Sequence, residues 1–295
     1  MQIPLLYLTI ILIWGSTWIV IPFQFGDVAT EMSVGYRFGL AAILLYAYAL
    51  LSGRKIALPA DAYKFVFLQG SLLFSLNYFL VYYGTAYITT GLVAVVSSTI
   101  IIFNAIFQRL FFRIEFEARV VVAACVGFTG IALIFWPEVP AMSLQDDTVI
   151  GILLVLFATI IASLGNMAAI VNTSRALPLV AVNAHAMAWA GITSVVIGLL
   201  LGRELNFSLS NDYLLSLAYL SLFGSALAFG CYLALIRRIG AAKASYSAVV
   251  VPIIALGIST LFEGYQWTGA AVLGIILTLI GNWLILYRPL TNTKP

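Results

Sequence analysis

The chain has 295 residues, of which 63% are hydrophobic and only 8% are charged. A soluble domain carries about 25% charged residues, so this composition excludes a soluble protein and indicates one that crosses the membrane several times. The net charge of +3 does not indicate a nucleic-acid-binding protein, because the basic residues fall in short connections between apolar runs. We therefore expect the lipid bilayer as a partner and no nucleic acid.

The apolar runs predict an all-α polytopic membrane protein with ten transmembrane helices. A hydrocarbon core of ~30 Å needs about 20 apolar residues per helix, and the run 65–108 is long enough for two helices. The first run has full span length and no basic segment before it, which predicts a retained helix and not a cleaved signal peptide. The expected helices cover 4–23, 34–52, 64–84, 91–112, 118–136, 149–171, 179–201, 213–236, 244–262 and 267–287.

Lys and Arg residues are sorted between the two sides of these helices. Only Arg37 and Arg203 fall on one side, and the other side carries the remaining twelve. Because cytoplasmic loops are enriched in Lys and Arg, we expect both termini to be cytoplasmic and the protein to lie in the inner (plasma) membrane. The twelve basic residues are Arg54, Lys55, Lys64, Arg109, Arg113, Arg119, Arg175, Arg237, Arg238, Lys243, Arg288 and Lys294.

The chain divides after the fifth expected helix, within residues 137–148. This division predicts an N-terminal five-helix repeat over residues 1–137 and a C-terminal five-helix repeat over 138–295. Because five is an odd number, the second half enters the membrane from the opposite side. Inverted repeats of this kind are a common construction of secondary transporters.

Three short matches between the halves support a duplication. Ile13-Trp14-Gly15-Ser16 aligns with Ser163-Leu164-Gly165-Asn166, and the segment 70–78 aligns with 224–232 through paired Gly-Ser and terminal Tyr residues. Glu115 and Glu263 end the fourth and ninth helices. The offsets are 150, 154 and 148, so the matches follow the same order in both halves.

Four motifs give the chain a family resemblance. They are Trp14-Gly15-Ser16, Arg37-Phe38, Ile239-Gly240-Ala241-Ala242, and Pro252 followed by Glu263. With them the chain resembles the drug/metabolite transporter superfamily, in its ten-helix EamA-type branch. It departs from the family pattern at Asn104, which stands where the second half has Pro252. The resemblance implies export of amino acids, related metabolites or drugs, without selecting a substrate.

Polar side chains at spacings of three and four along the helices predict a shared substrate cavity. Polar groups that face lipid have no partner, so a stripe of them is expected to face other helices. Tyr78 and Tyr232 lie in the middle of their helices, where an interfacial role does not fit. The candidate substrate-binding residues are Ser16, Ser71, Asn77, Tyr78, Tyr82, Ser97, Asn104, Ser163, Asn166, Ser225 and Tyr232.

Each candidate also has a structural interpretation. Ser and Thr in membrane helices often bond their own backbone or allow close helix packing. Three residues are candidates for coupling or gating. His185 is the single histidine and could titrate near neutral pH, although a structural role is favoured. Arg37 could attract a carboxylate substrate, but an ion pair with Asp27 or Glu31 is favoured. Glu263, like Glu115, is expected to be a boundary or gate group.

Several absences narrow the possible functions. No Asp or Glu lies in the middle of an expected helix, which disfavours a proton-coupled mechanism that needs an embedded carboxylate. No embedded pair of Lys or Arg residues is available for a phosphate group. The sequence predicts no cofactor, no metal site and no catalytic motif, and Cys125 and Cys231 are interpreted as packing residues.

The sequence thus predicts a secondary transporter for small metabolites, especially amino acids or related zwitterions, that works by alternating access around a polar and aromatic cavity. Alternatives are a drug or other metabolite facilitator, a channel, and an integral-membrane enzyme acting on lipid. The enzyme would have to use outer acids. Those acids are Asp146, Asp147, Glu204 and Asp212. We expect no enzymatic activity, and either a monomer or a weak homodimer.

Overall fold

The computed structural model describes residues 2–114, 118–135, 147–239, 244 and 247–286. Within these residues the regular secondary structure is entirely helical. Seven helical stretches of the described chain are long and apolar enough to cross a membrane, and α7, α13 and α14 each contain a shorter apolar stretch. The expected all-α fold with ten helices is therefore confirmed, and seven of the ten are long enough to be candidate spans.

Six of the ten spans are single helices, and four are divided into shorter segments. The described bounds agree with the expected helices, and the clearest shift is α2, which begins at Thr30 and not at residue 34. The spans are α1 (Ile3–Val20) with η1 (Ile21–Gln24); α2 (Thr30–Leu51); η2 (Ala60–Ala62), α3 (Tyr63–Gln69), η3 (Gly70–Leu76) and α4 (Asn77–Thr85); α5 (Thr90–Ser97) and α6 (Ile100–Phe112); α7 (Ala118–Phe135); α8 (Asp147–Ser174); α9 (Leu179–Leu200); α10 (Asn211–Tyr219), η5 (Leu220–Leu227) and α11 (Ala228–Ile239); α13 (Ser247–Phe262); and α14 (Gly269–Leu286).

Helix packing follows the pseudo-symmetry of an inverted repeat. The second and seventh spans, α2 and α9, pack along each other, as do the fifth and tenth, α7 and α14. The first span, α1, packs against α11 and α13, and its counterpart α8 packs against α4 and α6. The third and eighth spans each contain a π-helical segment, η3 and η5. The two halves of the chain are thus duplicated in their packing as well as in their sequence.

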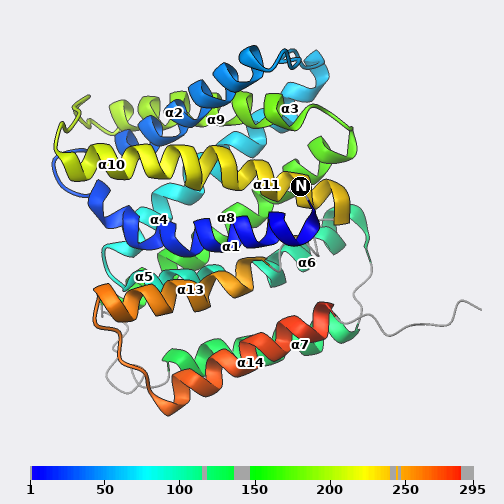
Figure 1. Ribbon diagram of the computed structural model, residues 1–295, viewed down its shortest axis with the longest axis vertical. Helices are drawn as coiled ribbons and strands as arrows, with labels where there is room; N and C mark the ends of the chain where they lie inside the picture. The colour runs from blue at the N-terminus through cyan, green and yellow to red at the C-terminus, as the bar shows by residue number, and fades with distance from the viewer. Residues whose placement is uncertain (1, 115–117, 136–146, 240–243, 245–246, 287–295) are drawn as a thin grey trace, which may run out of the picture.

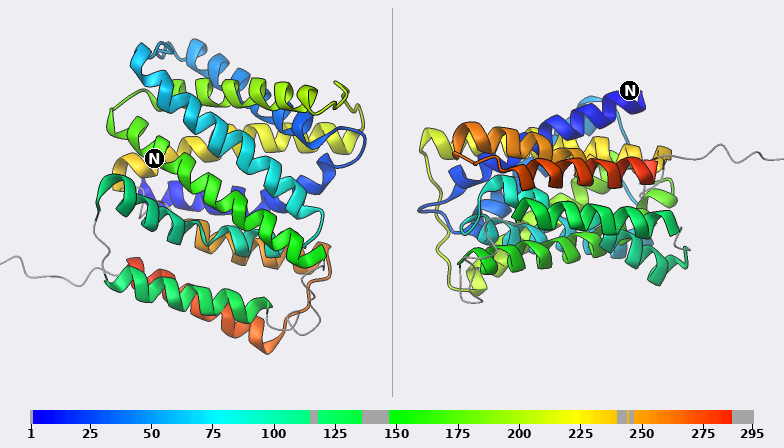
Figure 2. Two further views of the ribbon diagram at one scale, coloured as in Figure 1. Left: turned by 180° about the vertical axis from the view of Figure 1, so that it is seen from behind. Right: turned by 90° about the horizontal axis from the view of Figure 1, so that it is seen from below.

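The helices form two layers with a helix pair at each end. One layer contains α1, α10, α11 and α13, and the other contains α3, α4, α5, α6 and α8 (Figures 1 and 2). The α2–α9 pair lies at one end of the molecule and the α7–α14 pair at the other (Figure 1). Each layer combines helices from both halves, so the sequence repeats are not separate packing units.

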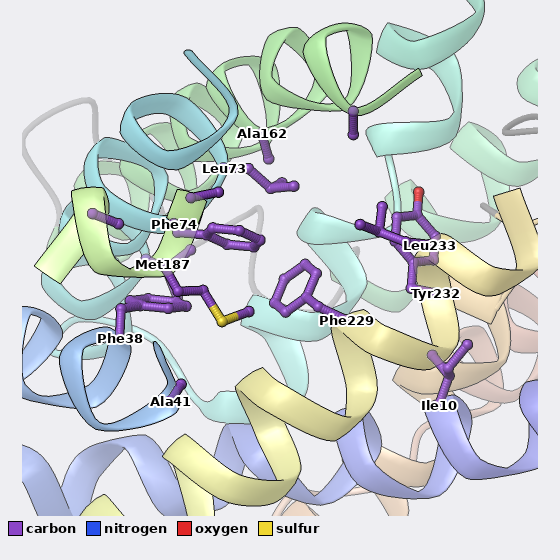
Figure 3. Close-up of a cluster of buried hydrophobic side chains, with 14 of the residues drawn as sticks. Ile10, Phe38, Ala41, Leu73, Phe74, Ala162, Met187, Phe229, Tyr232 and Leu233 are labelled. Carbon is purple, nitrogen blue, oxygen red and sulfur yellow. The ribbon is translucent and has the colours of Figure 1, made fainter. Parts of the chain in front are cut away.

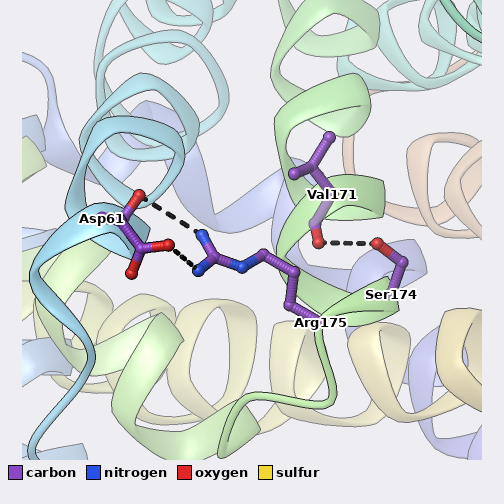
Figure 4. A network of polar contacts seen from close by, with 4 residues as sticks. All are labelled: Asp61, Val171, Ser174 and Arg175. Carbon is purple, nitrogen blue, oxygen red and sulfur yellow. Dashed lines mark hydrogen bonds and ion pairs between the residues drawn. The ribbon is translucent and has the colours of Figure 1, made fainter.

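The two edges of the bundle differ in charge. The edge at which α1 begins and α14 ends (Figure 1) carries Lys64, Arg175 and Arg237 and is here called the basic edge. At this edge the guanidinium of Arg175 contacts both the carboxylate and the carbonyl oxygen of Asp61 (Figure 4). Because the Asp61 side chain is 72% exposed, this ion pair contributes little to stability.

Aromatic and aliphatic side chains fill the space between the layers near the α2–α9 pair. Phe38 of α2 stacks on Phe74 of η3 at 5.3 Å between ring centroids, and Phe74 meets Phe229 of α11 at 4.7 Å. Met187 of α9 lies beside these rings (Figure 3). This cluster joins both layers to the end pair and fixes one wall of the central space.

Glycines allow the closest helix contacts. A Cβ added to Gly130 of α7 would collide with the carbonyl oxygen of Gly274 and lie 2.8 Å from the backbone nitrogen of Thr278. A Cβ on Gly274 of α14 would in turn collide with the carbonyl oxygen of Gly130. Small residues at membrane helix interfaces let backbones approach and pack, so this reciprocal pair sets the separation of α7 and α14.

We therefore predict that Gly130→Ala destabilises the protein by about 1–3 kcal/mol, the usual cost of overpacking. Gly127→Ala on the same helix is the matched control, because a Cβ there meets no atom within 4 Å. Thermal melting of both variants in detergent provides the measurement. Equal melting temperatures for the two variants would show that the glycine contact does not set this interface.

Candidate functional site

A cavity of about 120 Å³ lies between the two layers, near the middle of the bundle. Seven of the ten spans contribute to its described walls. The polar and aromatic lining consists of Trp14, Thr17, Trp18, Arg37, Asn77, Tyr78, Ser97, Ser98, Thr159, Asn166, Phe229 and Tyr232. The aliphatic lining consists of Ile21, Leu73, Val81, Ala94, Ile100, Ala162, Ala248 and Val251.

Five of the candidate substrate-binding residues lie in this wall, from four different spans. They are Asn77, Tyr78, Ser97, Asn166 and Tyr232. Only part of the predicted stripes reaches the wall. On α8 Thr159 and Asn166, seven residues apart, share the cavity face, whereas in the third span Tyr78 lines the wall and Ser71 and Tyr82 do not. The position of the five candidates in the wall establishes geometry, and their role in binding stays a prediction.

Two further candidates, Asn104 and Ser163, lie directly behind the wall. Ser163 Oγ donates to Asn104 Oδ1 at 2.7 Å, and Asn166 Nδ2 donates to the same oxygen at 3.3 Å. Asn166 Oδ1 is buried and has no hydrogen-bond partner. The cluster thus joins α6 to α8 and orients the Asn166 amide, leaving one acceptor at the cavity unused.

Aromatic rings form much of the remaining wall. Most of them were not predicted from the sequence to line a cavity. Trp14 lies 5.3 Å from Tyr232 and 5.1 Å from Phe229, measured between ring centroids. Trp18 lies one turn beyond Trp14, and its buried indole nitrogen has no hydrogen-bond partner. The i, i+4 spacing of the two tryptophans on α1 was the signal that could have identified them.

Arg37 lies in the cavity wall, fully buried at 1% exposure. Its Nε donates to Ser225 Oγ at 3.0 Å and its Nη1 donates to Tyr82 Oη at 3.3 Å. The guanidinium carbon also lies 4.5 Å from the centre of the Tyr78 ring. The candidates Ser225 and Tyr82 therefore hold Arg37 and do not themselves line the described cavity.

The prediction of an ion pair between Arg37 and Asp27 or Glu31 is wrong. Glu31 instead pairs with Arg203 at 3.6 Å and accepts a 2.6 Å hydrogen bond from Tyr83 Oη. Because α2 begins at Thr30, Arg37 lies two turns inside the helix. Six residues correspond to about 240° of rotation, so Glu31 and Arg37 point to different faces. Asp27 precedes the helix and is exposed.

Two more serine candidates, Ser16 and Ser71, also lie outside the cavity wall. Ser16 bonds the carbonyl oxygens of its own helix and lies 2.6 Å from Tyr219 Oη. Ser71 accepts a 2.9 Å hydrogen bond from Trp189 Nε1. Both therefore make helix contacts, as the structural interpretation of membrane serines anticipates.

His185 also lies away from the cavity. Its Nδ1 lies 2.9 Å from the carbonyl oxygen of Ala181, and its Nε2 lies 3.2 Å from Tyr63 Oη. The rings of Tyr46 and Tyr63 pack on its imidazole. Both ring nitrogens have partners, so this environment favours the structural role.

Glu263 ties the two layers together at the edge opposite the basic edge. Its carboxylate accepts hydrogen bonds from Thr90 N and Thr90 Oγ1 at the start of α5, and from Ser259 Oγ. A carboxylate at a helix N-terminus is favoured by the unpaired N–H groups and the helix dipole. Glu115, its expected counterpart, lies outside the described residues.

The fourth and ninth spans are irregular where they meet the cavity. The fourth breaks between Ser97 and Ile100, where the Ser98 and Thr99 hydroxyls bond carbonyls three residues back. The ninth contains Pro252, which has no N–H to donate to the carbonyl of Ala248, a cavity residue. Irregular backbone is tolerated at membrane depth where it lines a cavity.

Comparisons with known proteins give a consistent result. The model of the EamA-like transporter family matches residues 2–136 and again 149–287. The chain is 29% identical to the uncharacterized inner membrane transporter YedA of Escherichia coli, over 94% of this chain and 90% of YedA. It is 24% identical to the protein PagO of Salmonella typhimurium, over 97% and 93%.

A further curated relative and a solved structure agree with this match. The uncharacterized transporter YoaV of Bacillus subtilis is 21% identical, with 94% of each chain covered. A solved crystal structure with 16% identity superposes with a TM-score of 0.74, covering 95% of this chain and 94% of the other. At that identity the superposition supports the fold alone.

The shared acceptor at Asn104 generates a test of the cluster behind the wall. Asn104→Leu leaves two buried donors without their partner. We predict a loss of about 0.6–1.7 kcal/mol, which spans the average and the maximum found for hydrogen bonds between membrane helices. Ser163→Ala should cost much less in the Asn104→Leu background than in wild type. Melting temperatures of the two single variants and the double variant give the interaction energy between Asn104 and Ser163. Strictly additive losses would mean that the bond does not contribute.

Proposed function

Because the chain belongs to the EamA-like transporter family, we propose that it is a secondary transporter that exports small metabolites, amino acids and related zwitterions above all. Its partner is then a small solute and not a macromolecule, and it carries out no enzymatic reaction. The protein acts as a monomer or a weak homodimer in this proposal.

The central cavity is the observation that carries this proposal. Its volume of about 120 Å³ has room for several water molecules, since each needs roughly 10–15 Å³. A solute of amino-acid size replaces that water. Amide and hydroxyl groups of Asn77, Ser97 and Asn166 offer hydrogen bonds, and the rings of Tyr78 and Tyr232 offer stacking surfaces.

Alternating access then requires the two layers to move relative to each other. Each edge of the bundle has a contact that crosses between the layers. Glu263 of the connection after α13 binds Thr90 of α5 at one edge. Arg237 of α11 donates to the carbonyl oxygen of Leu177, in the connection after α8, at the basic edge. In this proposal the moving units are the layers and not the two sequence halves, and these contacts open in turn.

The orientation in the membrane follows from the distribution of charge. The basic edge faces the cytoplasm under the positive-inside rule, which places both termini there. The edge that carries Glu263 and the Glu31–Arg203 pair then faces outward. The inner membrane of a bacterium is the proposed location, in line with the name of the relative YedA.

Counterflow of radiolabelled amino acids into proteoliposomes tests the transport activity. We predict saturable exchange for wild type and a loss of about tenfold or more for Tyr78→Ala and Tyr232→Ala, because each removes a ring from the cavity wall. Tyr48→Ala is the matched control, since Tyr48 is 47% exposed on α2 and lies outside the described cavity wall.

Monodisperse elution in detergent confirms that the variants fold. Exchange in Tyr78→Ala and Tyr232→Ala at the rate of wild type would contradict the assignment of the cavity. Failure of the wild-type protein to exchange any amino acid would contradict the proposed substrates.

A further inference from the structure

We infer that the cavity is an anion site in which Arg37 binds the carboxylate of the transported solute. The carboxylate is then required for binding, whereas an ammonium group is dispensable. This inference rests on the proposed transport function and narrows its substrate to small organic molecules that carry one carboxylate.

Arg37 gives the cavity its charge. An arginine side chain stays protonated in proteins, and Arg37 is the one charged side chain among the described residues of the cavity wall. It is 1% exposed. A buried ionisable group inside a membrane protein is costly to keep and marks a substrate or ion pathway. The cavity is therefore electropositive.

The known partners of Arg37 orient the guanidinium without neutralising it. Ser225 Oγ and Tyr82 Oη accept from Nε and Nη1, and the Tyr78 ring lies beneath the guanidinium carbon. All three groups are neutral. In the described ion pairs the acids are Asp61, bound to Arg175, and Glu31, bound to Arg203.

Space around the guanidinium is kept open by Gly224 of η5. A Cβ at this position would lie 3.2 Å from Arg37 Nη2 and 2.8 Å from the Thr17 side chain. The guanidinium is thus held by two hydrogen bonds on one side and left uncrowded beside Nη2. Carboxylates match the planar fork of an arginine and bind it through two parallel hydrogen bonds.

The rest of the wall suits an apolar body better than a second charge. Trp14 and Phe229 present rings to the cavity. For an ammonium group, which has three donors, the described wall offers neutral acceptors such as Asn166 Oδ1, which is buried without a hydrogen-bond partner, but no carboxylate. A carboxylate with no ammonium group forms a neutral complex with Arg37, and a zwitterion leaves one positive charge. A cationic amine is repelled.

Three ligands of similar shape distinguish binding of a carboxylate, a zwitterion and a cationic amine. Leucine carries both charges, 4-methylpentanoate keeps only the carboxylate, and 3-methylbutylamine keeps only the amine. Calorimetric titration of the purified full-length protein in detergent at pH 7 should give binding of 4-methylpentanoate at least as tight as that of leucine. The amine should bind about tenfold more weakly or not at all, since bonds to a charged group are worth about 1.5–3 kcal/mol.

Variants assign the effect to Arg37. Arg37→Gln should weaken 4-methylpentanoate binding by about tenfold or more, and Arg37→Lys, which keeps the charge but loses the fork, should give an intermediate loss. Arg175→Gln removes an exposed arginine at the basic edge and should bind as wild type does. If Arg37→Gln does not fold, the ranking of the three ligands on wild type decides.

The inference is overturned if the amine binds as tightly as the carboxylates. It is also overturned if neither carboxylate binds wild type, or if Arg37→Gln binds 4-methylpentanoate normally. Counterflow separates this result from the proposed function. Carboxylate binding without any exchange would refute transport and leave the anion site. Exchange driven by 3-methylbutylamine would refute the anion site and leave transport.

Discussion

A polar group at membrane depth must find its partner inside the protein, because lipid offers none. This constraint explains how the helices of this chain are joined. Asn104 of α6 accepts two hydrogen bonds from α8, and Arg37 of α2 donates to Ser225 and Tyr82 of two other spans. These contacts cross between helices that are far apart in sequence. Together with the aromatic cluster, they bound the central cavity.

The inverted repeat supplies most of this framework twice, and the copies differ where the chemistry is. Ser71 and Ser225, which the internal alignment pairs, contact the seventh and second spans, and these spans are themselves counterparts. Ser71 meets the neutral indole of Trp189, whereas Ser225 meets the charged Arg37. The symmetric fold thus carries an asymmetric charge. Pro252 and Asn104 are a second difference, since Pro252 removes one backbone hydrogen bond inside α13 and Asn104 forms a hydrogen-bonded cluster.

Much of the fold could be predicted from the sequence because span length and charge sorting are averages over many residues. The site could be predicted only in part. The helical stripe identified Tyr78, Asn166 and Tyr232 because each lies on the inner face of a regular helix. It also selected Ser16, which bonds its own backbone, because periodicity alone does not distinguish a cavity from a helix contact.

The environment of Arg37 could not be derived from its position in the sequence. Its assignment to an ion pair followed from a helix start at residue 34, and the actual start at Thr30 carries the side chain two turns into the bundle. Glu31 is close to Arg37 in sequence, which suggested an ion pair, but the two residues lie on different faces of α2. Trp14 and Trp18 were not predicted to line the cavity, because an aromatic residue in an apolar helix cannot be distinguished by sequence from an ordinary core residue.

Alternating access is tested most directly by measuring whether the cavity can be reached from each side of the membrane. Ser97→Cys, in a chain with Cys125→Ser and Cys231→Ser, places one thiol in the cavity wall. Asp27→Cys and Ser52→Cys, exposed at opposite edges, calibrate the two sides. With a membrane-impermeant methanethiosulfonate on intact cells and on inverted vesicles, we expect the thiol at position 97 to react from both sides and each control thiol to react from one side. Reaction of position 97 from neither side, or from one side alone, would contradict alternating access.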